Sequence, residues 1–327
     1  MTASRHGPGA DLVGAGLVAL AAACFGTLGP LSRFAGDAGV DSLTLVTWRA
    51  AIGALVVTAF IAAWFMARGV RPKSLRQIPV RDRWFMLAAA VANTALNLAA
   101  FIAFERITIA LTLLVFYLYP AGVAVVSTVW FGERLGRLRW SALGLSLIGM
   151  ALVMAGAESL GELDLLGIGL AFLAALAQVF YVLAARHGFA HVPGPQAAAL
   201  TMGGAATLYV LIALVIGTLG SLGQPLASAA AITPVVLAGV VGAGVPTLAF
   251  IIGIRRLGPS QAAILATLEP VVGVGLAAWL LAETPTVLQL AGGLLILVAA
   301  VILQLRRGPR AEHEAVDVEP DEGTAPA

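Results

Sequence analysis

The sequence is poor in charge and in cysteine, and each shortage excludes a class of protein. Only 11% of its 327 residues are charged, against about 25% in soluble domains, while 60% are hydrophobic. An aqueous core could not hide so much apolar surface, so the bilayer must be the solvent of this chain. The one cysteine, Cys24, cannot form an internal disulfide and is expected to be a small core residue.

Catalytic motifs are also missing. No HExxH, GxSxG or Walker A string occurs, which argues against an intramembrane enzyme and a primary pump. A channel would require a ring of charged side chains or a filter of backbone carbonyls, and no segment of the sequence has the pattern of either. The basic residues lie in loops between apolar runs, so nucleic-acid binding has no support. The four histidines lie in loops or tails: His6, His187, His191 and His313.

Ten apolar runs are present, each near the roughly 20 residues that a membrane helix requires. The sequence therefore predicts an all-α polytopic membrane protein. The first run is too long for the core of a signal peptide. The expected spans are 12–34, 43–66, 84–105, 107–130, 138–157, 165–186, 196–219, 232–254, 259–281 and 286–305.

The basic residues predict the orientation of these spans. If the N-terminus is cytoplasmic, 16 of the 19 Lys and Arg residues fall on the cytoplasmic side. We therefore expect an integral protein of the inner (cytoplasmic) membrane with both termini inside and the lipid bilayer as its partner. The acidic stretch 307–327 is expected to be a disordered tail. The oligomeric state stays open, with a monomer as one option.

A repeat of 150 residues relates the two halves. Pro120 and Pro270 are each followed thirteen positions later by a glutamate, Glu133 and Glu283. Each half holds five spans, and an odd number inverts the second half relative to the first. Inverted repeats place substrate sites near the midplane and allow alternating access. The predicted parts are an N-terminus (1–11), a first repeat (12–157), a second repeat (158–306) and the tail (307–327).

These features resemble the drug/metabolite transporter superfamily, in particular its EamA-type members. The resemblance covers about residues 12–306 and implies a secondary transporter rather than an enzyme, with no cofactor and no metal. Among members, the chain most resembles the YddG-type exporters of aromatic or neutral amino acids, which implies a small-molecule substrate carried through a central cavity. The motifs that carry the resemblance are Phe25-Gly26-Thr27 with Pro30, Thr47-Trp48-Arg49, and Glu269-Pro270 through Glu283.

Two other substrate classes are less favoured. Small multidrug relatives carry an acid in the first span, and none lies between Leu12 and Gly36, which weakens a multidrug or organic-cation exporter without removing it. The only lysine, Lys73, lies in a loop, which disfavours a nucleotide-sugar carrier.

Two charged residues inside spans are the main functional candidates, since an intramembrane charge is costly. Glu269 lies near the centre of a span, and three roles compete: binding a substrate ammonium group, carrying a proton, or a structural hydrogen bond. Arg49 either snorkels or pairs with a carboxylate, or it contacts a substrate carboxylate. Together the two would suit a zwitterion.

The other candidates are polar and aromatic residues that either tie helices together or line a substrate site. Asn93 and Asn97 share a helix face, as do Gln178 and Tyr181. Tyr117 and Tyr119 precede Pro120. Phe25 and Phe101 are candidates for apolar walls.

Intramembrane prolines predict either static kinks or hinges that line a cavity. The hinge or gate candidates are Pro30, Pro120, Pro246, Pro270, Gly242 and Gly244. Glu133 and Glu283 are expected to be structural, either by capping the following helix or by pairing with an arginine such as Arg137.

Overall fold

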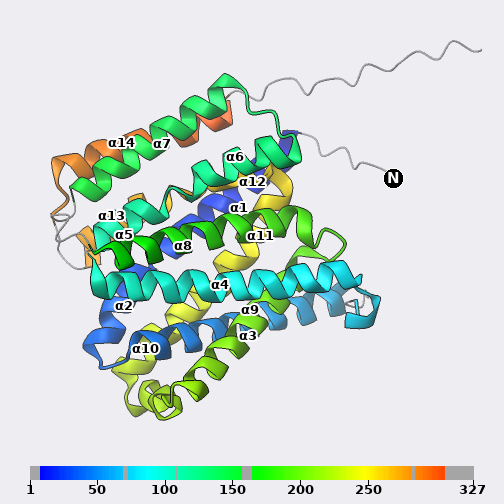
Figure 1. The fold of residues 1–327 in the computed structure, drawn as a ribbon, viewed down its shortest axis with the longest axis vertical. Coiled ribbons are helices and arrows are strands. Elements are labelled where there is room, and N and C mark those ends of the chain that lie inside the picture. The colour runs from blue at the N-terminus through cyan, green and yellow to red at the C-terminus, as the bar shows by residue number, and fades with distance from the viewer. Residues whose placement is uncertain (1–7, 69–72, 108, 157–163, 281–283, 306–327) are drawn as a thin grey trace, which may run out of the picture.

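The computed structural model describes residues 8–68, 73–107, 109–156, 164–280 and 284–305. Within these residues the elements are all helical (Figure 1). They are α1 (Pro8–Gly26), α2 (Leu28–Asp37), α3 (Ser42–Arg68), η1 (Leu75–Gln77), α4 (Val80–Arg106), α5 (Ile109–Phe116), α6 (Tyr119–Phe131), α7 (Arg137–Ala155), α8 (Leu165–Leu183), η2 (Ala184–Gly188), α9 (Gly194–Val215), η3 (Leu219–Ala227), α10 (Ala229–Gly239), η4 (Val240–Gly244), α11 (Val245–Leu257), α12 (Pro259–Ala266), α13 (Glu269–Leu280) and α14 (Val287–Leu305).

Eight helical segments among the described residues are long and apolar enough to cross a membrane. The remaining two expected spans coincide with α4 and α14, which fall outside this set, so the count of ten stays a prediction. The eight segments are Leu12–Asp37, Ser42–Ala67, Leu111–Phe131, Arg137–Ala155, Leu165–Gly188, Gly194–Val215, Ala229–Leu257 and Pro259–Leu280.

Three of the spans consist of two helices with a break between them. The breaks separate α1 from α2, α5 from α6, and α12 from α13. A proline lies two or three residues into each second helix, where it lacks the N–H that would continue the hydrogen-bond ladder. Threonine hydroxyls bond carbonyls at two of the breaks: Thr27 to Cys24 and Thr267 to Ile264, each at 2.6 Å. Such bonds keep backbone polar groups satisfied where no water is available.

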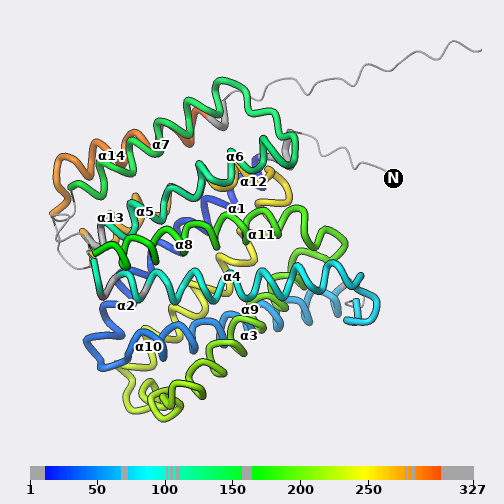
Figure 2. The backbone as a smooth tube through the Cα atoms, viewed as in Figure 1, coloured from blue at the N-terminus to red at the C-terminus, as the bar shows by residue number. Residues whose placement is uncertain are grey.

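The two halves of the chain interlock instead of forming separate domains. Helix α1 packs along α11, and α4 packs along α8. The repeat equates α1 with α8 and α11 with α4, so these two contacts are the same contact made twice. The backbone trace shows α4 as one unbroken helix beside α8 (Figure 2). Each half therefore completes the packing of the other.

Helices that the repeat equates with each other run antiparallel, as an inverted repeat requires. In the α7–α14 pair, Gly149 lies against Gly292 and Ile296, while Gly156 lies against Thr286 and Gln289. Residue numbers therefore rise along α7 while they fall along α14. Helices α3 and α9 are likewise antiparallel, since Gly53 meets Met202 whereas Val46 and Ala50 cluster with Ala205 and Tyr209.

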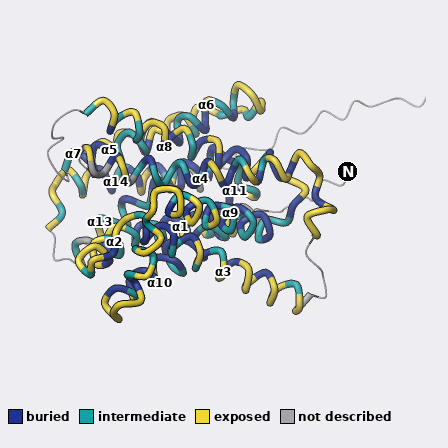
Figure 3. Tube along the Cα trace, turned by 60° about the horizontal axis from the view of Figure 1, so that its bottom comes forward, coloured by how far each residue is buried: buried dark blue, intermediate teal, exposed yellow. Residues whose placement is uncertain are grey.

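The outer surface of the bundle is apolar. Met66, Trp130 and Val215 are 84%, 77% and 84% exposed, and exposed residues line the outward faces of the helices (Figure 3). An aqueous protein would bury such side chains, whereas lipid solvates them without cost. The burial pattern therefore agrees with a bilayer as the surrounding solvent.

A capping interaction joins the end of α4 to the start of α8. The Asp164 carboxylate accepts hydrogen bonds from the Leu166 backbone N–H and the Arg106 guanidinium, both at 2.9 Å. The Arg106 bond holds the pKa of this exposed carboxyl below its ordinary value. A carboxyl with a lowered folded-state pKa stabilises the fold above its unfolded pKa, and that contribution disappears as the pH falls.

The closeness of α7 and α14 depends on glycine. A Cβ at Gly149 would lie 2.7 Å from the Gly292 carbonyl oxygen, whereas a Cβ at Gly144 on the same helix meets nothing within 4 Å. Gly149→Ala should lower the free energy of unfolding by about 1–3 kcal/mol through overpacking. Gly144→Ala should leave it unchanged or raise it. Thermal unfolding of the purified variants in detergent measures both, and equal midpoints would contradict the packing argument.

Candidate functional site

Glu269 is the first residue of α13 and stands directly after the break that ends α12. Its half-buried carboxylate thus belongs to a helix N-terminus, whose partial positive charge favours an anion. Helix α1 ends beside it. A Cβ at Gly26 would lie 2.8 Å from the Glu269 carbonyl oxygen, so this approach requires a glycine. The break in a span of the second repeat therefore lies against the break in a span of the first.

A third break, between α5 and α6, brings tyrosines to the same place. Tyr117 and Tyr119 both lie near enough to the Glu269 carboxylate to interact with its charge. Phe116 completes an aromatic cluster, with ring centroids 5.2 Å from Tyr117 and 5.3 Å from Tyr119. Both tyrosines are buried, at 2% and 3% exposure. Tyr119 is the repeat counterpart of Glu269, so the two equivalent positions lie in one cluster.

Arg49 on α3 supplies the opposite charge. Its Nη2 donates to Asn97 Oδ1 at 3.0 Å. Asn97 is in turn held by Asn93, because its Nδ2 donates to the Asn93 backbone oxygen at 2.7 Å and side-chain oxygen at 3.1 Å. Arg49 and Glu269 are close enough for their charges to attract. The structure thus brings together six of the residues that the sequence singled out: Arg49, Asn93, Asn97, Tyr117, Tyr119 and Glu269.

Tyr209 on α9 is a member of this site that the sequence reasoning missed. It is 2% exposed and interacts with the Arg49 charge, yet its hydroxyl forms no hydrogen bond with any described residue. Asn97 faces it without reaching hydrogen-bond geometry. The available signal was its chemistry, because the chain has only four tyrosines and this one sits alone in an apolar helix.

The other expected substrate contacts are not joined to the two charged residues. Gln178 and Tyr181 are on α8, and among the described residues no hydrogen bond or ion pair joins them to Glu269 or Arg49, although Tyr181 belongs to the same buried core as Tyr117 and Tyr119. The Tyr181 hydroxyl is buried without a partner there. Phe25, one residue before Gly26, packs edge-on against Phe250 at 6.4 Å. Phe101 belongs to α4, but its side chain lies outside the described part of the structure.

The four candidate prolines are all buried and lie near the starts of helices. Pro120 and Pro270 are the second residues of α6 and α13, and Pro30 is the third residue of α2. Pro246 differs, because it follows the π-helical turn η4 rather than a break.

Both candidate hinge glycines belong to η4. A Cβ at Gly244 would lie 2.9 Å from Val56 Cβ, and one at Gly242 would collide with Leu28. These glycines therefore permit close packing against α3 and α2. Their role as hinges, like that of the prolines, stays a prediction.

Glu133 contacts both the opposite repeat and α7, the helix that follows it. Its carboxylate accepts a hydrogen bond from Ser260 Oγ at 2.8 Å, in the first turn of α12. Its ion-pair partner is Arg139, at 3.6 Å, in place of the expected Arg137. The glutamate thus ties the turn before α7 to the start of α12. Its counterpart Glu283 lies outside the described residues.

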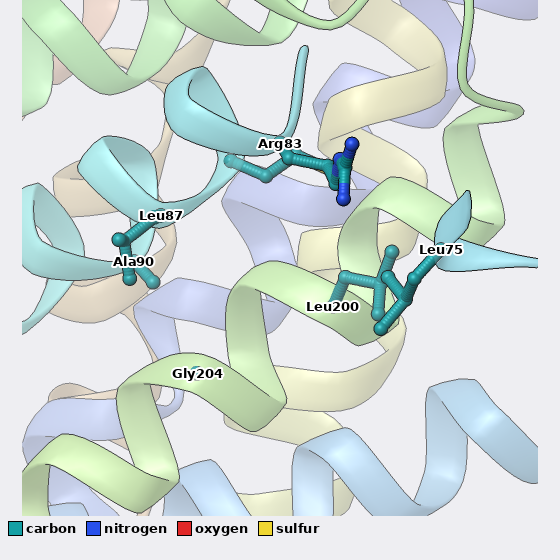
Figure 4. Close-up of a pocket in the computed structure, with 7 residues that line it drawn as sticks. Leu75, Arg83, Leu87, Ala90, Leu200 and Gly204 are labelled. Atoms are coloured by element: carbon teal, nitrogen blue, oxygen red, sulfur yellow. The ribbon is translucent and has the colours of Figure 1, made fainter. Parts of the chain in front are cut away.

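A pocket of about 260 Å³ opens elsewhere, between α4, α9 and η1 (Figure 4). Apart from Arg83 its lining is apolar. It lies toward the start of α4, and Ala90 in its wall precedes Asn97 by seven residues, or roughly 10 Å along a helix. The pocket is therefore separate from the charged site. It is lined by Leu75, Arg83, Met86, Leu87, Ala90, Leu200 and Gly204.

The interlocked halves, the broken spans and the internal charges define a polytopic membrane protein with a polar centre. Comparison with family models matches the EamA-like transporter family twice, at residues 12–155 and 165–305. The chain belongs to this family, and membership indicates a membrane transporter of small molecules.

Comparison with curated proteins finds no match. Among solved structures, one described as "Crystal structure of protein" is 23% identical, with a TM-score of 0.74. The alignment covers 90% of this chain and 96% of that one. At this identity, the likeness extends to the fold alone.

The contact between Glu133 and Ser260 yields a stability prediction. Ser260 is fully buried, so Ser260→Ala removes a hydrogen bond to a charged group and should cost about 1–3 kcal/mol of unfolding free energy. The matched control is Ser141→Ala, because the exposed Ser141 hydroxyl bonds only the Leu138 carbonyl of its own helix. Thermal unfolding in detergent should separate the two variants, and coincident curves would argue against the contact.

Proposed function

We propose that the protein is a secondary transporter of the inner membrane that exports neutral or aromatic amino acids by alternating access. The observation that carries the proposal is that Arg49 and Glu269 lie near enough within the bundle for their charges to interact. The two side chains come from different repeats and are half-buried. Intramembrane charges at such positions usually mark a substrate or ion pathway.

A zwitterion suits this pair. The Glu269 carboxylate would bind the ammonium group, and the Arg49 guanidinium would bind the carboxylate in a planar geometry. The ring cluster of Phe116, Tyr117 and Tyr119 offers an apolar wall for a neutral or aromatic side chain. Asn93 and Asn97 orient Arg49.

The arrangement of the halves supports alternating access. Three broken spans meet at the charged site, and each half packs against the other. In the proposed cycle, the helices around the breaks rock about Pro30, Pro120, Pro246 and Pro270, opening the site to one side and then the other. The proposal includes ten spans, two five-helix repeats (12–157 and 158–306) and both termini in the cytoplasm.

An organic-cation exporter is the alternative, and one observation favours it. An acid beside two tyrosine rings is also a good site for a cation that lacks a carboxylate. Arg49 decides against it, because a second positive charge would repel such a substrate. The two readings differ in which compounds cross the membrane.

Reconstitution in liposomes tests the proposed function. Counterflow should exchange labelled neutral and aromatic amino acids across the membrane, while empty liposomes show no exchange. Because charge pairing on Arg49 requires a carboxylate, cationic dyes should move poorly. Flux of dyes without flux of any amino acid would establish the organic-cation reading instead.

Glu269→Gln should separate a binding or proton role from a structural one. The amide keeps the shape and loses the charge, so amino acid counterflow should fall at least 10-fold while the thermal unfolding midpoint changes little. Asp37→Asn, at the exposed end of α2, is the matched control and should transport normally. Wild-type flux and an unchanged pH profile in Glu269→Gln would contradict a binding or proton-carrying role and show that Glu269 is structural.

A further inference from the structure

Arg49 has more hydrogen-bond donors than the described residues around it accept. A guanidinium has five N–H donors, and among the described residues Arg49 gives one hydrogen bond, to Asn97. The Tyr209 hydroxyl beside it is buried and unpaired within the described structure. A buried hydroxyl without a partner is costly, so an unpaired one calls for an explanation.

Packing fixes Tyr209 in this position. It belongs to a tight cluster with Val46 and Ala50 of α3 and Ala205 of α9, with Leu98 of α4 packed against it. Val46 and Ala50 flank Arg49 in sequence, and Leu98 follows Asn97. The same three helices therefore hold the guanidinium, the amide and the phenol at one junction.

A partner for both groups has to accept hydrogen bonds, and beside a guanidinium an anion is the favoured acceptor. The Asn97 oxygen already accepts from Arg49, and its nitrogen donates to Asn93. Glu269 lies near enough to interact with both Arg49 and Tyr117. A carboxylate meets the requirement, since one oxygen can accept from the guanidinium and the other from the phenol.

We propose that Tyr209 is a specificity-determining residue that, with Arg49, forms a subsite for the carboxylate of the substrate. The inference rests on the proposed function and names the residue that distinguishes an amino acid from the corresponding amine. Binding then exchanges partners: the substrate carboxylate takes over Arg49 and the Tyr209 hydroxyl, and the substrate ammonium takes over Glu269. An amine can bind Glu269 through its ammonium group but has no carboxylate to bind Arg49 and Tyr209.

Tyr209→Phe removes the hydroxyl and keeps the ring. The KM for phenylalanine in counterflow should rise about 10-fold, because a hydrogen bond to a charged group is lost. The inhibition constant of phenethylamine, which has no carboxylate, should not change. The empty variant should be at least as stable as the parent, since an unpaired buried hydroxyl is gone. Thr207→Val on the same helix, whose exposed hydroxyl bonds only the Gly203 carbonyl, should leave both constants unchanged.

Thermal stabilisation by phenylalanine, benzoate and phenethylamine distinguishes failure of the inference from failure of the proposed function. If amino acids do not exchange but benzoate stabilises the parent more than Tyr209→Phe, the exporter proposal fails and the subsite stands. An unchanged KM for phenylalanine, equal effects on phenylalanine and phenethylamine, or a destabilised empty variant would overturn the subsite. Absence of stabilisation of the parent by any carboxylate would overturn it as well.

Discussion

The surrounding lipid offers no hydrogen bonds, and that constraint determines where this chain can stop being a helix. A break in a membrane span frees backbone groups, and a charge in the span needs a partner, so both must face protein. In this protein the breaks and the charges lie at one place. The ends of α1, α5 and α12 meet around Glu269, threonine hydroxyls bond carbonyls at two of these breaks, and Arg49 lies near enough to interact with the Glu269 charge. Gathering these polar groups in one centre lets them satisfy one another, whereas the same groups scattered over the bundle would each face lipid.

The two halves interlock because neither half buries its own helix surfaces completely. Because α1 pairs with α11 and α4 with α8, neither half presents a finished surface of its own. In the antiparallel α7–α14 and α3–α9 pairs, a helix of one repeat packs against the equivalent helix of the other. A site built from both halves is therefore a direct product of the topology: Arg49 and Tyr117 come from one repeat, Glu269 and Tyr209 from the other.

Much of this was accessible from the sequence, because intramembrane prolines and charges are rare enough to identify individually. The 150-residue spacing predicted the repeat that the family models match twice, and Glu269, Arg49, Asn97 and Tyr117 were selected for their cost in lipid. What a sequence cannot predict is contact between distant helices. Nothing in the pattern placed Tyr209 beside Arg49 or joined Glu133 to Ser260. Those facts depend on helix rotation and crossing, which residue spacing along one helix does not encode.

The Glu133 contact also removes an equivalence that an inverted repeat would otherwise impose. If the two halves were perfectly symmetric, exchanging them would convert the inward-facing arrangement into the outward-facing one, and the two would have equal free energy. Glu133 has a serine hydroxyl to bind at the start of α12, but the residue 150 positions before that serine is Ala110, which has no hydroxyl to offer Glu283. In the proposed alternating-access cycle, a serine hydroxyl available to the glutamate of one repeat and not to that of the other would make the two arrangements unequal, and about 1.4 kcal/mol is enough for a tenfold difference in population.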